Sequence, residues 1–403
     1  MRFSGFDDEW KKSNLGNISS NEMYGMNSAA KDYDGFNKYI RITDISETSN
    51  KFIPNPLTSP DGDLEDKYKL KKGDIVFART GASTGKTYLY DDNDRNLYFA
   101  GFLIKFHIDN ADPKFIFYNT LKEEYLNWVS VMSVRSGQPG INSNEYKKLP
   151  IILPSLDEQN KISNFLTSID KKIDLLERKH QFYQEFKKYL MQQIFTQKLR
   201  FNFTDEWEKY LLGDISLIGK GFTPSTSNPS FWDGDLKWLS IADMNQGKYI
   251  NQTTKKITSD GSKNKEPVKK GTLLMSFKLS IGKLGILTED MYTNEAICNF
   301  KWKNKDVLTE YMYYYLSSIN ILKYGSQAAK GITLNNETLS TIPVLLPSLE
   351  EQKKIINILS DVDMKINMLE NSINDTSKFK KGLLQQMFVV QLILSLLQNK
   401  KHI

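Results

Sequence analysis

The residues whose types and spacing come closest to a chemical motif lie in the glycine-rich loop Gly81-Ala82-Ser83-Thr84-Gly85-Lys86-Thr87. This loop resembles a P-loop, in which successive backbone N–H groups surround a phosphate. A P-loop needs four residues between its glycines, whereas this loop has three. The similar segment 277–283 lacks the first glycine. We therefore do not predict a nucleotide site.

Other catalytic motifs are equally incomplete. Asn55-Pro56-Leu57 is the nearest match to the Asn/Asp-Pro-Pro-aromatic loop of DNA amino-methyltransferases, but it lacks the second proline and the aromatic ring. Three histidines and one cysteine are too few for a Cys/His metal cluster. We predict no catalytic residue and no metal site in this chain.

Two pairs of carboxylates recur along the chain, Asp44 with Asp243 and Asp170 with Asp363. The members of each pair are too far apart in sequence to indicate a shared metal ion. For the first pair we expect a turn at the end of a strand, and for the second a solvated helix face.

The glycine-rich loop has a composition better suited to DNA. An arginine can donate two hydrogen bonds to a base edge, hydroxyl groups and a lysine can contact phosphates, and glycines allow close approach. The second segment keeps the basic and hydroxyl character. The candidate DNA contacts in these two loops are Arg79, Thr80, Ser83 and Lys86, then Lys278, Ser280 and Lys283.

A second pair of loops, 136–142 and 327–335, contains amides able to read an adenine edge. Its candidate contacts are Gln138, Asn142, Lys330, Thr333 and Asn335. Ordinary turns on a β-rich domain would have similar compositions, so the turn interpretation remains open for both pairs of loops.

Length and composition set the broad class. A chain of 403 residues with 39% hydrophobic and 25% charged residues is expected to fold into two or more domains. Its net charge of +6 permits a polyanionic partner without requiring one. Residues 1–10 lack the apolar core of a signal peptide, and no stretch reaches the roughly 18 apolar residues of a membrane span. We expect a cytoplasmic protein with no membrane partner.

The strongest pattern is a duplication of the whole chain. Each half opens with a related segment, 6–19 and 203–216, and closes with Leu153-Pro154-Ser155-Leu156-Asp157-Glu158-Gln159 or its copy at 346–352. From these closing motifs the two copies run without a gap to Phe195 and Phe388, identical at about half of their positions. Between opening and close they diverge. Each half is thus a variable part followed by a nearly constant tail.

The constant tails predict long helices, because apolar residues recur at alternating spacings of four and three. Pro154 and Pro347 prevent these helices from extending upstream. The predicted seams are 162, 166, 169, 173, 176, 180, 183, 187, 190 and 194, and 355, 359, 362, 366, 369, 373, 376, 380, 383 and 387. Polar residues at five of these positions, namely His180, Tyr183, Lys187, Thr376 and Lys380, are expected to weaken the seam and to fix its register. Packing of each helix on its own globular part alone is the competing interpretation.

The variable parts predict α+β domains. Short apolar runs bounded by glycine, aspartate, asparagine or proline indicate strands at 38–42, 74–78, 102–106, 271–277 and 296–300. The aromatic stretches 115–118 and 311–316 are expected to be helical.

The repeated opening and closing motifs and the long helices that follow resemble the specificity subunits of type I restriction-modification systems over residues 3–388. The resemblance implies two target-recognition domains and two conserved helical regions that bind methyltransferase subunits. It agrees with the course of the predicted helices, because antiparallel pairing would bring the second helix back to the first variable part. We therefore expect two tandem α+β target-recognition domains, separated by a long antiparallel two-helix coiled coil with pseudo-two-fold symmetry. The corresponding domains are target-recognition domain 1 (1–152), helical spacer 1 (153–200), target-recognition domain 2 (201–345), helical spacer 2 (346–388) and an atypical apolar tail (389–403).

The same resemblance implies a non-catalytic chain that recognises a bipartite site in double-stranded DNA. Its partners would be two methyltransferase subunits, which modify adenine, and two restriction subunits. S-adenosylmethionine, ATP and Mg would be used by these partners, and this chain would need no cofactor of its own.

One departure from the pattern is the apolar tail after Phe388, where the first copy has the basic segment 196–201. Packing on a partner, a frameshift and impaired assembly all remain open as explanations of the tail. Two other functions also remain open: a coiled-coil scaffold without DNA binding, and an enzyme with an unrecognised active site.

Overall fold

The computed structural model describes the backbone of residues 2–278, 280–328 and 331–399. It describes the side chains of all of these except 326–328, 331–333 and 389–399. The chain forms two compact units: unit 1 contains residues 1–176 and 372–403, and unit 2 contains residues 177–371. Each unit therefore combines one globular part with stretches of both long helices, α5 (Leu156–Phe195) and α10 (Leu349–Asn399).

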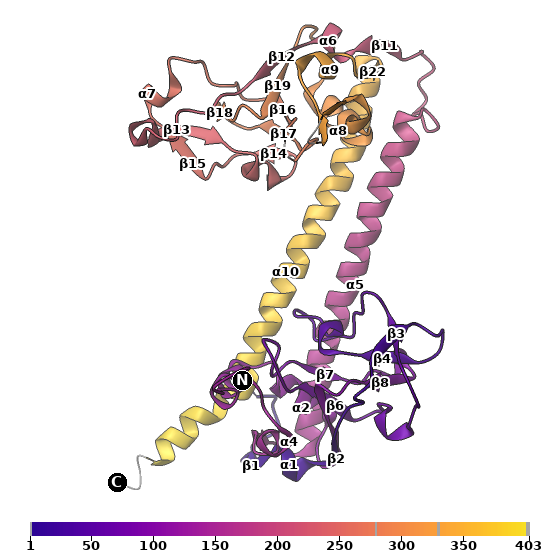
Figure 1. Ribbon diagram of the computed structural model, residues 1–403, viewed down its shortest axis with the longest axis vertical. Coiled ribbons are helices and arrows are strands. Elements are labelled where there is room, and N and C mark those ends of the chain that lie inside the picture. Colours follow the sequence, from indigo (N-terminus) through magenta and orange to yellow (C-terminus); the bar gives the residue numbers. More distant parts are fainter. Residues whose placement is uncertain (1, 279, 329–330, 400–403) are drawn as a thin grey trace. The chain divides into compact units, whose positions relative to one another are not determined.

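The globular part of unit 1 is built from short strands and short helices (Figure 1). In chain order its elements are β1 (Lys11–Asn14), α1 (Leu15–Ile18), β2 (Ser19–Tyr24), β3 (Ala30–Asp32), β4 (Lys38–Ile40), β5 (Thr58–Pro60), β6 (Asp74–Ala78), β7 (Thr87–Leu89), β8 (Leu97–Phe99), β9 (Leu103–Ile108), α2 (Pro113–Asn119), α3 (Glu123–Met132), α4 (Ser143–Tyr146) and β10 (Pro150–Leu153).

The main sheet of unit 1 has the order β2-β9-β6-β7, and all of its pairs are antiparallel. Strand β6 is buried at every position and β9 at every position except His107, as expected for strands that are covered on both faces. One face packs on the aromatic helix α2 and on α5, and the other packs on a smaller cluster that includes Ile40 and Phe99. A separate antiparallel pair, β1 with β10, joins the opening of this half to its close.

Unit 2 repeats this plan with different strand lengths. Its elements are β11 (Glu208–Leu211), α6 (Leu212–Ile215), β12 (Ser216–Lys220), β13 (Trp232–Leu239), β14 (Tyr249–Ile250), β15 (Lys255–Ile257), α7 (Ser259–Ser262), β16 (Leu273–Ser276), β17 (Leu284–Leu287), β18 (Tyr292–Thr293), β19 (Ile297–Trp302), α8 (Thr309–Ser318), β20 (Ser326–Ala328), β21 (Gly331–Thr333), α9 (Asn336–Ser340) and β22 (Pro343–Leu346).

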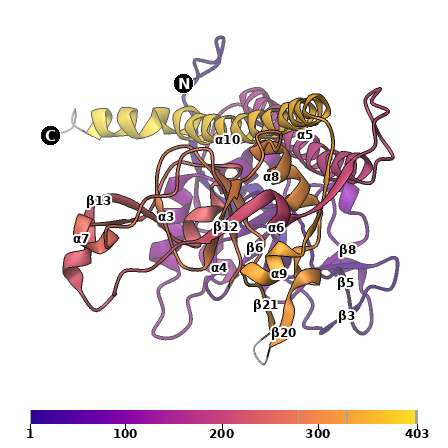
Figure 2. The same ribbon diagram turned by 90° about the horizontal axis from the view of Figure 1, so that it is seen from above.

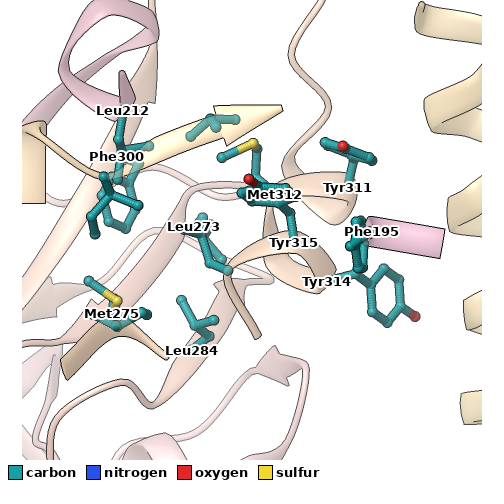
Figure 3. Close-up of a cluster of buried hydrophobic side chains, with 14 of the residues drawn as sticks. Phe195, Leu212, Leu273, Met275, Leu284, Phe300, Tyr311, Met312, Tyr314 and Tyr315 are labelled. Carbon is teal, nitrogen blue, oxygen red and sulfur yellow. The ribbon is translucent and has the colours of Figure 1, made fainter. Parts of the chain in front are cut away.

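The main sheet of unit 2 has the order β12-β19-β16-β17-β14, and β11 pairs with β22 as β1 pairs with β10. Helix α8 covers this sheet and brings the rings of Tyr311 and Tyr315 against Phe195 of α5, with centroids 5.9 and 5.4 Å apart (Figure 3). Helices α6 and α9 lie side by side at the end of the sheet (Figures 1 and 2). The predicted strands and aromatic helices are confirmed, as is the α+β class.

Within each unit the two long helices run antiparallel. In unit 1 the buried residues Ile162 and Leu166 of α5 share a core with Leu383 and Met387 of α10. In unit 2 the late residues of α5, including Leu190 and Ile194, share a core with the early α10 residues Ile355 and Leu359. These are predicted seam positions. The cores also include side chains from the globular parts, so each helix packs both on its neighbour and on its own domain.

The prediction of a solvated helix face for Asp170 and Asp363 is wrong. In unit 1, Asp170 accepts a hydrogen bond from Tyr118 Oη at 2.8 Å and pairs with Lys380 Nζ at 2.6 Å. In unit 2, Asp363 accepts one from Tyr314 Oη at 2.6 Å and pairs with Lys187 Nζ at 2.6 Å. Each carboxylate therefore joins both helices and the aromatic helix of its domain. Two of the polar seam residues, Lys187 and Lys380, supply the ammonium groups of these ion pairs. They therefore connect the two long helices across the seam.

The closing motif has an equally definite structural role. Glu158 is buried and accepts hydrogen bonds from Arg2 Nε and Nη2 at 2.9 and 2.7 Å and from Trp10 Nε1 at 3.2 Å. Glu351 makes the same contacts with Arg200, at 3.0 and 2.6 Å, and with Trp207, at 3.0 Å. The first turn of each long helix is thus fastened to the opening segment of its own half.

The neighbouring glutamines fasten the helix to a second point. Gln159 Oε1 accepts a hydrogen bond from Asp112 N at the start of α2, at 2.9 Å, and its amide donates to Pro154 O. Gln352 repeats this with Leu308 N at 3.0 Å and with Pro347 O. These partners explain why the Glu-Gln pair recurs.

Candidate nucleic-acid interface

The glycine-rich loop of unit 1 connects β6 to β7 as a tight, internally bonded turn. Ala78 N donates to Lys86 O at 2.8 Å, and Gly85 N donates to Ala78 O at 2.9 Å. Gly85 has φ +92°, and a Cβ there would lie 2.6 Å from Val129 Cγ1, so only glycine suits this position.

The backbone donors of this loop also argue against a P-loop. The N–H groups of Gly81, Thr84, Gly85 and Lys86 all donate to carbonyl oxygens of the chain itself. Phosphate binding needs such N–H groups to point together at the ligand. The loop also leads into strand β7, whereas a P-loop leads into a helix.

The two candidate loops of unit 1 lie against one another. Gly81 N donates to Pro139 O at 2.9 Å, Ile141 N donates to Arg79 O at 2.9 Å, and Thr80 bridges to Gly140. Gln138 Nε2 would lie 3.1 Å from a Cβ on Gly81. Five of the candidate residues of unit 1, namely Arg79, Thr80, Ser83, Gln138 and Asn142, thus belong to one surface formed by segments 79–83 and 138–142.

Arg79 is the most clearly positioned cation of this surface. Its Nε donates to Gly101 O at 3.1 Å, and its guanidinium lies 5.0 Å from the ring centroid of Tyr24 and 5.9 Å from that of Phe102. Phe102 is 59% exposed although it is aromatic. Within the described part of the chain, the two Nη groups of Arg79 have no hydrogen-bond partner, so they are oriented and available.

Arg79 borders an open cavity of about 760 Å³ in unit 1. Its lining combines cations, amides and aromatic rings, which is the chemistry that binds bases and phosphates. The lining residues used below are Tyr24, Arg41, Arg79, Phe102 and Gln138.

Two other candidates of unit 1 are occupied inside the protein. Lys86 Nζ donates to Ile45 O at 3.0 Å and pairs with Glu47, and its side chain is only 8% exposed. Asn142 is exposed but acts as the N-cap of α4, because its Oδ1 accepts a hydrogen bond from Glu145 N at 3.0 Å. In this conformation the Lys86 ammonium is bound within the protein, and Asn142 has a structural role of its own.

In unit 2 the corresponding loop lies between β16 and β17. Lys278 and Ser280 are exposed, and the ammonium of Lys278 lies 5.7 Å from the ring centroid of Phe277. Lys283 Nζ donates to Asn245 Oδ1 at 2.8 Å. These residues give unit 2 a basic loop at the equivalent place.

The second candidate loop of unit 2 is only partly covered. Lys330 lies outside the described residues, and Thr333 is described only as the backbone end of β21. Asn335 is the N-cap of α9 and accepts a hydrogen bond from Thr338 N at 2.8 Å. Among the described residues no hydrogen bond joins this loop to 277–283, in contrast to unit 1.

Arg41 is a further cation of this site that the sequence pattern did not predict. Its guanidinium donates from Nε to Asp44 Oδ2 and from Nη2 to Asp44 Oδ1, both at 2.8 Å, and this pairing raises the pKa of Arg41. As expected, Asp44 ends a strand in a 3-10 turn, Ile42–Asp44. Asp243 occupies the equivalent turn, Ala242–Gln246, where its carboxylate accepts from Ser240 N and Oγ. The recurrence of Asp44 and Asp243 in the sequence could have pointed to Arg41, because each aspartate accepts a hydrogen bond from the backbone N–H of the residue three positions earlier.

Neither a cluster of metal ligands nor a membrane-spanning helix is present among the described residues. They include no group of three or more His, Cys, Asp or Glu side chains that would hold a metal ion. None of the helices described has the length and apolar character needed to cross a membrane.

Comparison with known proteins decides the family. The model of the type I restriction modification DNA specificity domain matches twice, at residues 7–181 and 204–376. The chain belongs to this family. Both matches include one globular part and most of the helix that follows it, as the duplication predicted.

The curated relatives agree with this assignment. The specificity subunit of the type I restriction enzyme HindI from Haemophilus influenzae is 24% identical over 87% of this chain and 93% of its own length. The MjaIX specificity subunit from Methanocaldococcus jannaschii is 30% identical over 41% of this chain and 39% of its own. These names support a DNA-recognition role, and none supports the scaffold alternative.

Solved structures share the fold. The S subunit of a type I restriction-modification system from M. genitalium aligns with a TM-score of 0.59 at 15% identity, covering 96% of this chain and 97% of that one. A chain from another type I system structure aligns with a TM-score of 0.59 at 17% identity, covering 95% and 97%.

Proposed function

We propose that this chain is the sequence-reading subunit of a type I restriction-modification complex, and that each unit reads one half of a bipartite DNA site. The observation that carries the proposal is the double family match onto two units with the same closing network and different loops. A constant framework with variable loops is expected when two domains recognise different DNA sequences but assemble into the complex in the same way.

The surface formed by segments 79–83 and 138–142 is the proposed DNA contact of unit 1, and the loop 277–283 that of unit 2. Phosphate contacts from lysine and hydroxyl groups would supply affinity, while arginine and amide groups would supply sequence preference. We propose Arg79, Thr80, Ser83 and Gln138 first, because they lie on one surface. Lys86 would have to leave Glu47 to take part.

We further propose that the chain itself is non-catalytic. Two methyltransferase subunits would modify adenine with S-adenosylmethionine, and two restriction subunits would use ATP and Mg. The complex would act in the cytoplasm, beside the DNA that it reads.

An exposed aromatic stripe on α5 in unit 2 is a suitable contact for such a partner. Phe182, Phe186 and Tyr189 are 61%, 38% and 59% exposed and follow one another at spacings of four and three. The rings of Phe182 and Phe186 are stacked, 6.2 Å apart. Exposed apolar side chains at helical spacing are typical of surfaces that receive another helix.

DNA binding is the direct test of the proposal. The chain is co-purified with the methyltransferase subunit of its own system, and binding to labelled duplexes is measured at several salt concentrations. We expect a sequence preference, and an affinity that falls steeply with salt because phosphate contacts release counterions. A complex that assembles but binds no duplex would support the scaffold function instead.

The partner surface has its own test. The double variant Phe182→Ser/Phe186→Ser should lose most co-purification with the methyltransferase subunit while keeping its thermal midpoint. Gln184→Ser, on an exposed residue of the same helix, is the matched control. Undiminished co-purification of the double variant would show that the stripe is not the contact.

A further inference from the structure

The cavity of unit 1 holds a second arginine whose position is set by the framework. Asp44 is 1% exposed and accepts three hydrogen bonds from Arg41: from its backbone N at 2.9 Å and from Nε and Nη2 at 2.8 Å each. The Arg41 side chain is 32% exposed, and the residue lines the cavity together with Arg79 and Gln138.

The equivalent turn of unit 2 keeps the aspartate and changes the residue that it holds. Asp243 is 7% exposed and accepts from Ser240 N at 2.9 Å and from Ser240 Oγ at 2.7 Å. The two aspartates therefore perform the same backbone task, since each accepts the N–H of the residue three positions earlier. The side chain held there differs, a guanidinium in unit 1 and a hydroxyl in unit 2.

The pairing with Asp44 leaves a defined part of the guanidinium available. Nε and one hydrogen of Nη2 face the carboxylate, so Nη1 and the other hydrogen of Nη2 point away from it. Within the described residues Nη1 has no hydrogen-bond partner. Two parallel donors on a fixed plane match the O6 and N7 acceptors of guanine in the major groove. Fixing the side chain in advance also reduces the rotamer entropy lost on binding.

We propose that Arg41 reads a guanine in the half-site of unit 1, that Asp44 is its positioning residue, and that Ser240 occupies the corresponding reading position in unit 2. The proposal rests on the DNA-binding function proposed above and deepens it, because it assigns one base to one side chain. Arg79, whose guanidinium lies near the rings of Tyr24 and Phe102, lines the same cavity and would contact the neighbouring backbone or base.

The test measures the sequence preference of the assembled complex on a library of duplexes randomised one position at a time. Arg41→Gln should change one guanine of one half-site to adenine or remove the preference, because an amide matches the adenine edge. The original sequence should bind about 10- to 100-fold more weakly, the range expected for one lost bidentate contact. Arg41→Lys keeps the charge without the fork and should relax the same position.

Two further variants separate reading from folding. Asp44→Asn should weaken the same guanine preference without creating a new one, because it releases Arg41 but leaves it present. Ser240→Ala should leave that half-site unchanged and affect only the other half.

Each alternative gives a different result. A uniform loss for all sequences, with a shallower salt dependence, would show that Arg41 binds a phosphate and would overturn the proposal. An unchanged sequence preference in Arg41→Gln would show that Arg41 only stabilises the turn that contains Asp44. That result would also overturn the proposal. If the wild-type complex has no sequence preference at all, the proposed function fails first, and the assignment of Arg41 fails with it.

Discussion

Glu158 and Glu351 are the residues on which the closing motif depends. Each is about 1% exposed and is satisfied by one arginine and one tryptophan from the opening of the same half. A buried carboxylate needs such partners, because losing its water contacts without replacement costs several kcal/mol. The repetition of the motif is visible in the sequence, but its partners are not. The repetition of Arg2-Phe3 as Arg200-Phe201 in the sequence could have identified the two arginine partners.

Replacing this carboxylate should be costly. Glu158→Gln removes the charge that Arg2 and Trp10 share, and we expect the free energy of unfolding to fall by about 2 kcal/mol, as for lost hydrogen bonds to a charged group. The measurement is the urea midpoint followed by tryptophan fluorescence. Asp157→Asn, at the exposed neighbouring position, should leave the midpoint nearly unchanged. Equal midpoints for both variants would contradict the role assigned to Glu158.

Cys298 provides a chemical probe of unit 2. Its side chain is fully buried on β19, burial raises the pKa of the thiol to about 12, and Sγ donates to Met275 O. Thiolate is the reactive form and exists mainly above the pKa, so at pH 8 the group stays protonated and enclosed. We expect a thiol reagent to leave the native protein unmodified at pH 8 and to label one thiol after denaturation. Rapid labelling of the native protein would contradict this packing.

At the candidate interface, the loops were more predictable from the sequence than the side chains. The sequence predicts loops 79–87 and 136–142 as two separate candidates, and the structure brings them together. Asn142, for which the amide predicts a base contact, also caps α4. The signal was present, because Asn142 with Glu145 is a capping box. Composition alone predicts a phosphate contact for Lys86, and only the three-dimensional structure shows that Glu47 is its partner.

At the scale of elements, the helical seams followed from the sequence because apolar periodicity is a local property. Ile162, Leu166 and Ile169 are buried as predicted. The polar positions could not be interpreted in this way, because Lys380 and Asp170 are more than 200 residues apart in sequence and form their ion pair only when the helices run antiparallel. The ring of Tyr118 completes this cluster, 5.4 Å from the Lys380 ammonium.

A double-mutant cycle on this ion pair tests the helix pairing. The variants are Lys380→Met, Asp170→Asn and the combination of both. The side chains are 18% and 26% exposed, so we expect a coupling energy of about 1 kcal/mol, between the values for surface and buried pairs. Lys381→Met, on an exposed residue, should show no coupling to Asp170→Asn. Simple additivity of the Lys380 and Asp170 effects would exclude the contact.

The segment after Phe388 belongs to the second long helix as far as Asn399. Helix α10 continues to Asn399, so the residues from 389 to 399 extend the helix. The side chains of this stretch lie outside the described residues.

At the scale of the whole molecule, the duplication in the sequence predicted two similar halves. It did not indicate how each half closes on itself. Strand β1 pairs with β10 and β11 with β22, which places the opening and the close of each half in one small sheet. Such pairing joins residues more than 130 positions apart, for which periodicity carries no information. The unit divisions at 176 and 371 fall within the long helices, so each unit depends on both copies of the constant tail.

The central claim is that each half reads its own part of a divided DNA site. The most direct measurement is a single-molecule methylome of cells carrying the intact gene, a deletion, or a chimera in which residues 1–150 come from another specificity subunit. We expect N6-methyladenine in a split motif that disappears on deletion, and whose one half alone changes in the chimera. A motif that survives deletion, or a chimera that changes both halves at once, would contradict the account.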